Sequence, residues 1–325
     1  MAKFMATIDE MEGKNDFWLV LNQTGEGQTI TIEGYSGESK KVIIPGSFEG
    51  IPVTAIGDAA FSYEKKMTAV ILPEGITSIE DSAFSGCTEL TSISLPKTLV
   101  NIEDNVFFGC SRLTEIIVDE QNPIFASDDG VLFDKNRTTL ISYPGGKKGE
   151  YAIPDTIVEI GKEALDNCKE LTCISFPQGL MGGDLGFLGC ERLADIIVDG
   201  KNSMFSSIDG IFFDKEGKYL LRYPQGKDNT DYFVPDKTDC IFFNAFHGCK
   251  NLSNIIFPEG LRFILGGAFI RCEGLIAITL PESLQYIGKQ AFKSCSHLET
   301  ITLSRRTKNG CRAFEGFTGR LIYRD

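Results

Sequence analysis

A phrase of 23 residues recurs along most of the chain, and it limits the possible folds more than any other feature. LPEGITSIEDSAFSGCTELTSI begins at Leu72, and related copies begin at Leu95 and Leu280. A fixed period of about 20–29 residues with apolar positions in the form L-x-x-I-x-L is typical of a leucine-rich repeat, in which each unit buries its apolar side against its neighbours. Nine units align on one position, which we call the Phe column: Phe61, Phe84, Phe107, Leu165, Phe187, Phe246, Phe269, Phe292 and Phe314.

Each standard unit predicts two short strands and a turn. Leu90–Leu95 alternates as a strand, and Pro96 ends it because proline cannot donate to a sheet ladder. Leu99–Ile102 predicts a second extended piece, and Glu103–Cys110 predicts a helical turn closed by Gly109. We therefore expect an α/β repeat, which is a leucine-rich repeat solenoid of stacked parallel short strands with helical turns.

The first residues differ from the repeats. Phe17–Asn22 and Thr29–Tyr35 alternate in hydrophobicity around the Gly-bearing segment Gln23–Gln28, which predicts a β-hairpin. A solenoid needs a cap over its apolar end. We therefore expect an N-terminal β cap over residues 1–50 and a solenoid of nine registers over residues 51–325.

Two units are longer than the others. The steps from Phe107 to Leu165 and from Phe187 to Phe246 are each more than twice the standard step. The additional sequences, 116–147 and 196–227, resemble each other without a gap, so that Ile116 corresponds to Ile196 and Lys147 to Lys227. Their alternation predicts hairpins inserted near 120–147 and 200–227.

The net charge of −13 disfavours nucleic acid and anionic membranes as partners, because both require a basic surface. No apolar run approaches the length that a membrane-spanning helix needs, so we expect no membrane insertion. Residues 1–15 contain no apolar segment typical of a secretory signal. The sequence predicts a cytoplasmic monomer, or a cell-surface or secreted protein if the chain is a trimmed form.

Seven of the ten cysteines lie three residues after the Phe column. Neighbouring units are close enough for disulfides, but an odd number of cysteines cannot all pair. Side chains in register also point the same way, which disfavours bridges between units. Zinc requires closely spaced cysteine or histidine pairs, which these positions lack. The favoured interpretation is a column of small buried thiols. Off this column, Cys173 falls at an outward position, either as a reactive thiol or as an ordinary surface cysteine.

Catalytic patterns are weak in this sequence. His247 and His297 occupy different positions of the repeat, and the glycine-rich segment Gly182–Gly189 lacks the full spacing of a nucleotide-binding loop. Acidic pairs such as Glu103-Asp104 are interpreted as solvated turn residues. We expect no enzyme activity, no cofactor and no metal site.

We call the first strand of each unit, such as Leu90–Leu95, its main strand. The outward positions of the main strands form the candidate partner-binding surface. They are almost uncharged, although β-branched residues also suit any pleated surface, and the inserted hairpins are the alternative recognition surface. The candidate residues are Ser92, Ser94, Glu115, Ile117, Ser175, Asp195, Ile197, Asn254, Ile256, Thr279 and Thr302.

The motif LPESLQYIGKQAFKSCSHLETITL resembles the BspA-like leucine-rich repeat family of bacteria, as do the DGVLFDK insert and the segment that leads into the first unit. The resemblance implies a leucine-rich repeat fold across nearly the whole chain. Better-known members are secreted or surface-held and bind host proteins or other cells. We therefore expect a non-catalytic protein–protein interaction scaffold with an unidentified protein partner, with a secreted or cell-surface adhesin for host or microbial proteins as the alternative.

Overall fold

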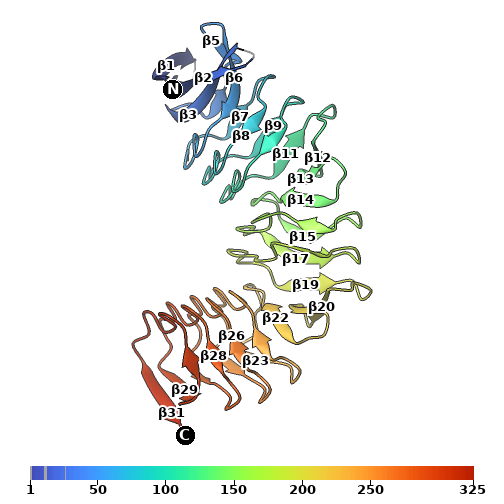
Figure 1. Ribbon diagram of the computed structural model, residues 1–325, viewed down its shortest axis with the longest axis vertical. Helices are drawn as coiled ribbons and strands as arrows, with labels where there is room; N and C mark the ends of the chain where they lie inside the picture. Colours follow the sequence, from blue (N-terminus) through green and yellow to red (C-terminus); the bar gives the residue numbers. More distant parts are fainter. Residues whose placement is uncertain (1, 11–12, 26) are drawn as a thin grey trace. The chain divides into compact units, whose positions relative to one another are not determined.

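The computed structural model describes residues 2–10, 13–25 and 27–325 (Figure 1). They form two compact units, which we call unit 1 and unit 2. Each unit consists of stacked coils whose short strands pair with the same strand of the neighbouring coil. Unit 1 contains residues 1–147, 156–169 and 182–185, and unit 2 contains residues 148–155, 170–181 and 186–325.

Unit 1 has three sheets. The first is seven-stranded and contains β1 (Ala2–Glu10), β2 (Gly13–Thr24), β3 (Gly27–Gly37), β6 (Ile51–Ile56), β8 (Ser78–Ile79) and β10 (Asn101–Ile102), with β5 (Ser47–Phe48) beside β6. The second contains β4 (Lys41–Ile43), β7 (Ala69–Ile71), β9 (Ser92–Leu95) and β11 (Glu115–Val118). The third contains β12 (Phe125–Asp128), β13 (Val131–Asp134), β14 (Thr139–Ser142), β16 (Glu159–Ile160) and β18 (Gly182–Gly183).

Unit 2 has four sheets. Its seven-stranded sheet contains β20 (Phe205–Ile208), β21 (Ile211–Asp214), β22 (Tyr219–Arg222), β24 (Cys240–Ile241), β26 (Phe263–Ile264), β28 (Tyr286–Ile287) and β30 (Lys308–Asn309). The main strands form three smaller sheets: β15 (Gly149–Ala152), β17 (Leu171–Phe176) and β19 (Asp195–Val198); β23 (Asp231–Phe233) and β25 (Asn254–Ile256); and β27 (Ala277–Thr279), β29 (Thr300–Ser304) and β31 (Arg320–Arg324).

The hairpin expected near the N-terminus is present as β2 and β3, which pair antiparallel. Glu26, in the predicted loop between them, lies outside the described residues. The hairpin joins the solenoid directly, because β3 pairs with β6 in parallel. Tyr35 of β3 stacks on Phe61 with ring centroids 5.1 Å apart, so this strand also extends the aromatic core of the repeats.

The Phe column forms the core of both units, as its spacing predicts. Phe61 stacks on Phe84 at 5.2 Å in unit 1. In unit 2, Phe269 lies between Phe246, at 4.9 Å, and Phe292, at 5.0 Å, with ring planes within 13° of parallel. These rings are fully buried. The regular step of the repeat therefore reproduces one aromatic contact from coil to coil.

The prediction of a helical turn after the second strand is wrong, because none of the described residues lies in an α-helix. The turn holds left-handed residues four apart, such as Ser82 (φ 56°) and Gly86 (φ 72°). The N–H groups of Ser82, Phe84 and Gly86 donate to carbonyl oxygens of the next coil at 2.8–3.1 Å, whereas those of Ala83 and Ser85 close turns within their own coil. An α-helix would direct all of these groups along its own axis, so it would remove the ladder between coils. Within the described part of the chain, no helix has the length and apolar character needed to cross a bilayer.

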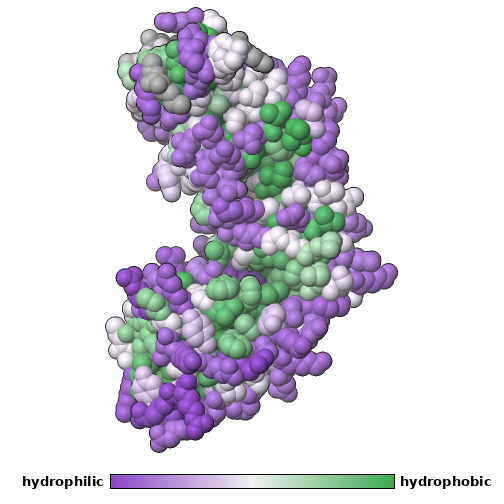
Figure 2. Space-filling view, viewed as in Figure 1, coloured by the Kyte–Doolittle hydropathy of each residue, from purple (hydrophilic) through white to green (hydrophobic). Residues whose placement is uncertain are grey.

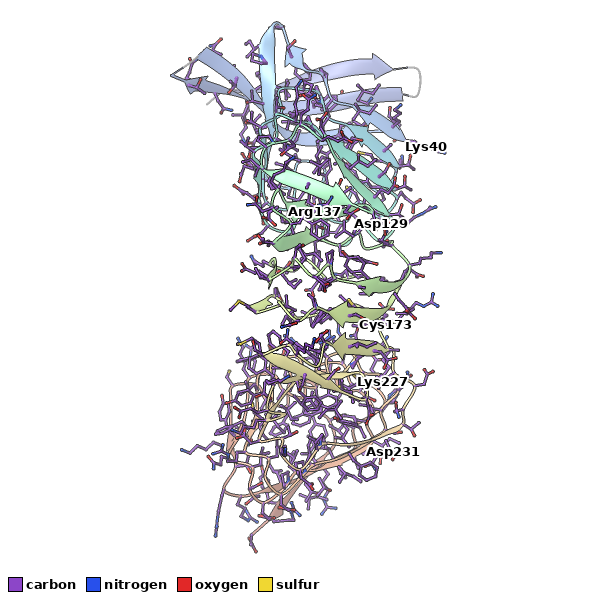
Figure 3. The ribbon with its side chains drawn as sticks, turned by 90° about the vertical axis from the view of Figure 1, so that its right-hand side faces the viewer. Lys40, Asp129, Arg137, Cys173, Lys227 and Asp231 are labelled. Atoms are coloured by element: carbon purple, nitrogen blue, oxygen red, sulfur yellow. The ribbon has the colours of Figure 1, made fainter. Side chains whose placement is uncertain are left out.

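The long units insert antiparallel strands in the places that the sequence predicts. In unit 1, β12 pairs with β13 and β13 with β14, and β14 then continues in parallel to β16. Unit 2 repeats this pattern with β20, β21, β22 and β24. In the first insert, ion pairs of 2.9 Å join Arg137 to Asp128 and Lys147 to Asp129. Arg137 and Asp129, which belong to different pairs, are labelled in Figure 3.

A buried asparagine fixes the beginning of each insert, and neither asparagine was predicted from the sequence to have this role. The Nδ2 group of Asn122 donates to the carbonyl oxygens of Pro96 and Leu99, and its Oδ1 accepts from the N–H groups of Ile124 and Phe125, all at 2.8–2.9 Å. Asn202 makes the same four contacts in unit 2. Both residues are fully buried.

The seven cysteines after the Phe column are buried, and none of them forms a disulfide within the described residues. Cys87 Sγ lies 3.0 Å from the carbonyl oxygen of Phe61, and Cys272 Sγ lies 3.0 Å from that of Phe246. The thiol thus donates to a backbone carbonyl group of the preceding coil. A small side chain with one weak donor suits this position, which gives the cysteine a structural reason to recur.

These thiols should react slowly in the native protein. Burial raises the pKa of Cys249 to about 12, so almost none of it is thiolate near neutral pH, and the thiolate is the reactive form. We expect a maleimide to modify exposed Cys311 rapidly and the seven buried cysteines only after unfolding, as read by peptide mass spectrometry. Rapid labelling of native Cys249 would contradict this assignment.

Candidate binding surface

In unit 1, the outward residues of the main strands form two cross-strand rows. We call the first the isoleucine row of unit 1, because three of its four members are isoleucines that are 41–47% exposed. Hydrophobic side chains accordingly lie over β9 and β11 in Figure 2. The isoleucine row is Ile43, Ile71, Ser94 and Ile117, and the second row is Lys41, Ala69, Ser92 and Glu115.

In unit 2, the predicted surface residues fall into separate sheets. Ser175 pairs with Ile197 across β17 and β19, and Cys173 pairs with Asp195 in the neighbouring row. Asn254 and Ile256 lie on β25, which pairs with β23. Thr279 pairs with Thr302 across β27 and β29. Side chains of these strands alternate between buried positions and positions that are half-buried or exposed.

The charges of the surface are partly neutralised by the inserts. Lys227, at the end of the second insert and labelled in Figure 3, donates from Nζ to Asp195 Oδ1, and the two atoms are 3.1 Å apart. The Lys227 side chain is only 14% exposed, so its ammonium group is held close to the sheet. The contact thus neutralises the charge of Asp195 beside Ile197, an apolar side chain that is 49% exposed.

The structure adds apolar residues that the sequence analysis did not place on this surface. Phe233 is 67% exposed and pairs directly with Ile256, which is 45% exposed. Ile322 of β31 extends the row of Thr279 and Thr302. Residues 228–233 lack the apolar spacing of a standard unit, which is why Phe233 was missed. Its place follows only from the pairing of β23 with β25.

The two histidines have different surroundings. His247 is partly buried, and burial together with the nearby guanidinium groups of Arg222 and Arg271 lowers its pKa to about 4. It is therefore neutral at physiological pH. His297 is exposed, and its Nδ1 lies 2.6 Å from the carbonyl oxygen of Glu273. No cluster of three or more His, Cys, Asp or Glu side chains within the described ranges could hold a metal ion.

The repeat pattern, the stacked coils and the outward strand rows define a leucine-rich repeat protein. The chain belongs to the family described as the BspA type leucine-rich repeat region, which matches residues 38–133, 148–216 and 225–321 in six copies. The match covers the short units and is interrupted within both inserts, at residues 134–147 and 217–224. A comparison with curated protein sequences gives no significant match.

Solved structures of bacterial proteins share this fold. A leucine-rich repeat protein from Eubacterium ventriosum is 20% identical, with a TM-score of 0.57 over 95% of this chain and 74% of that one. A leucine-rich cell surface protein from Faecalibacterium prausnitzii is 21% identical, with a TM-score of 0.53 over 98% and 95%. The pneumococcal vaccine antigen PcpA is 19% identical, with a TM-score of 0.52 over 100% and 89%.

Proposed function

We propose that the protein is a non-catalytic scaffold that binds a protein partner through the outward rows of its main strands. The observation that carries this proposal is the isoleucine row of unit 1, where exposed Ile43 pairs directly with exposed Ile71, and exposed Ile117 lies beyond Ser94 in the same row. Single exposed apolar residues are ordinary, but neighbouring ones on an open sheet are typical of an interaction surface. In unit 2, the pair of Phe233 and Ile256 provides a second such feature.

The N-terminal strands support this role as a cap. Strands β1, β2 and β3 precede the first main strand, β4, which already pairs with β7, and β3 covers the end of the repeat ladder by pairing with β6. A capped end keeps the coils from associating end to end. A monomer that binds its protein partner through the strand rows is the arrangement that follows.

A second candidate function is a surface or secreted adhesin. It is favoured by two of the structural relatives, which are described as a cell surface protein and a vaccine antigen. Protease treatment of intact native cells tests it, with an antibody to this chain as the readout. Cleavage on intact cells supports the adhesin, and protection until lysis supports a scaffold inside the cell.

Substitutions on the isoleucine row test the proposed surface. We expect Ile117→Asp to weaken the binding of a partner captured by cross-linking in native cells by at least about tenfold, because it places a charge in an apolar contact. The free energy of unfolding should change by less than about 0.5 kcal/mol, since the side chain is exposed. Calorimetric titration and urea unfolding measure the two quantities.

The control is Ile124→Asp, which changes an exposed isoleucine of the first insert. Its partner affinity should equal that of the unmodified protein if the strand rows bind. Loss of affinity in Ile124→Asp, with normal affinity in Ile117→Asp, would assign recognition to the inserts.

A further inference from the structure

The two long units differ at one buried position. When the inserts are aligned, Ser142 at the end of β14 corresponds to Arg222 at the end of β22. Both residues precede a buried tyrosine whose N–H group donates to the coil that follows the insert: Tyr143 to Ala164 at 2.9 Å, and Tyr223 to Ala245 at 2.8 Å. The local backbones are therefore equivalent, and the side chains are not.

In unit 2, Arg222 fills the space between the insert and the coils around it. The residue is only 1% exposed. Its Nη2 donates to the carbonyl oxygen of Phe187 at 2.9 Å, and its Nη1 donates to that of Asn244 at 2.6 Å. The guanidinium group thus bridges the turn of the coil before the insert and the turn of the coil after it.

In unit 1, the same place is a cavity of about 180 Å³. Its lining includes Ser142, together with Phe107 and Glu163, the counterparts of Phe187 and Asn244. An apolar cavity of about 150 Å³ can hold benzene, so this space admits a planar group of four heavy atoms. Asp104 and Lys162 of the lining are more than half exposed, so the cavity is open to solvent.

The polar atoms of the cavity favour a donor-rich cation. Buried Asn105 Oδ1 in its lining has no hydrogen-bond partner among the described residues. The lining also contains four carboxyl groups and a single ammonium group, that of Lys162, which lies 2.7 Å from Asp104 Oδ2. The carboxyl groups are those of Glu103, Asp104, Glu163 and Asp166.

The side chains around Arg222 differ in charge from those around the cavity beside Ser142. Where Arg222 fills the space, the following coil has Asn244 and the neutral His247. Where the space is open, the same positions of the coil hold Glu163 and Asp166. Burial raises the pKa of Glu163, Lys162 lowers it, and the carboxylates of Asp184 and Asp104 raise it again. The net rise means that the carboxylate form is disfavoured here, and a further cation beside it would stabilise that form.

We propose that the cavity beside Ser142 is a binding site for an external guanidinium group, which would occupy the place that Arg222 occupies in unit 2. A guanidinium is planar and donates along several edges, so it matches acceptors on opposite sides better than an ammonium group does. The group would come from an arginine side chain of a partner polypeptide or from a small guanidino compound. The site is separate from the isoleucine row and does not depend on it.

Calorimetric titration with N-acetyl-arginine methylamide tests the site, with the isosteric, uncharged citrulline analogue as the control ligand. We expect saturable binding of the arginine probe and at least tenfold weaker binding of the citrulline probe. Ser142→Arg should abolish binding, because it fills the cavity with the side chain found at position 222. Equal binding of the two probes, or unchanged binding in Ser142→Arg, would overturn the proposal.

Glu163→Gln provides an independent variant that keeps the size of the side chain. It should weaken the arginine probe at least fivefold while leaving the melting temperature nearly unchanged, and it decides the question if Ser142→Arg does not fold. Unchanged affinity in Glu163→Gln under those conditions would refute the site. A peptide with one arginine that binds at least tenfold more tightly than the probe would support a polypeptide source, and equal affinity would support a small guanidino compound.

Discussion

Replacing Phe269 with alanine should lower the free energy of unfolding by about 3–5 kcal/mol, the range typical of a buried phenylalanine. The ring is fully buried and stacks on Phe246 at 4.9 Å and on Phe292 at 5.0 Å. Its removal leaves a cavity between two coils and breaks both aromatic contacts. Because each coil is stabilised only by its neighbours, the loss also uncouples the coils on either side.

Urea unfolding followed by circular dichroism measures this loss, and Phe243→Ala is the matched control. Phe243 is 56% exposed in the neighbouring coil, so its truncation should cost less than about 1 kcal/mol. Equal destabilisation by the two substitutions would show that the Phe column is not the core of unit 2.

The inward half of the fold was predictable because the repeat fixes it. Each coil must place its Phe-column residue and its leucines against the same positions of the next coil, so nine aligned copies determine the core. The turn was not predicted, since Gly109 near the end of Glu103–Cys110 also fits the end of a helix. The signal that could have corrected this is the polar residue four positions earlier, Asn105 (φ 57°), because asparagine tolerates the left-handed conformation of Gly109.

The surface was predictable only in part. Strand alternation placed Ile117, Ile197 and Ile256 outward, and their exposure of 45–49% agrees with that prediction. The cavity beside Ser142 was not predictable, because a serine at the end of an insert strand does not indicate which coils it lies between. Its significance follows from comparing the place with its counterpart at Arg222, which requires the packing of both long units.

Replacing Asn202 with alanine should also cost about 3–5 kcal/mol, although the side chain is small. The amide is fully buried and makes four hydrogen bonds of 2.8–2.9 Å, two as donor to Pro177 and Leu180 and two as acceptor from Met204 and Phe205. A buried backbone group left without a partner costs about 1–3 kcal/mol. Alanine would remove all four bonds, but the carbonyl oxygen of Pro177 would keep its bond from the Leu180 N–H group at 3.3 Å, and water can reach Met204, which is 46% exposed.

The carboxylate variant separates hydrogen bonding from packing. Asn202→Asp keeps the shape of the side chain but replaces the two N–H donors with an oxygen that faces the carbonyl groups of Pro177 and Leu180, so it should destabilise at least as much as Asn202→Ala. If burial raises the pKa of the new carboxyl group, part of the stability should return as the pH falls through that pKa, because the protonated form can donate once. Urea unfolding from mildly acidic to mildly basic pH measures this, with Asn229→Asp as the exposed control.

A cost below about 1 kcal/mol for both Asn202 variants would mean that the insert is held by its strands alone. The costs expected here would instead show that one amide sets where each long unit leaves the regular coil.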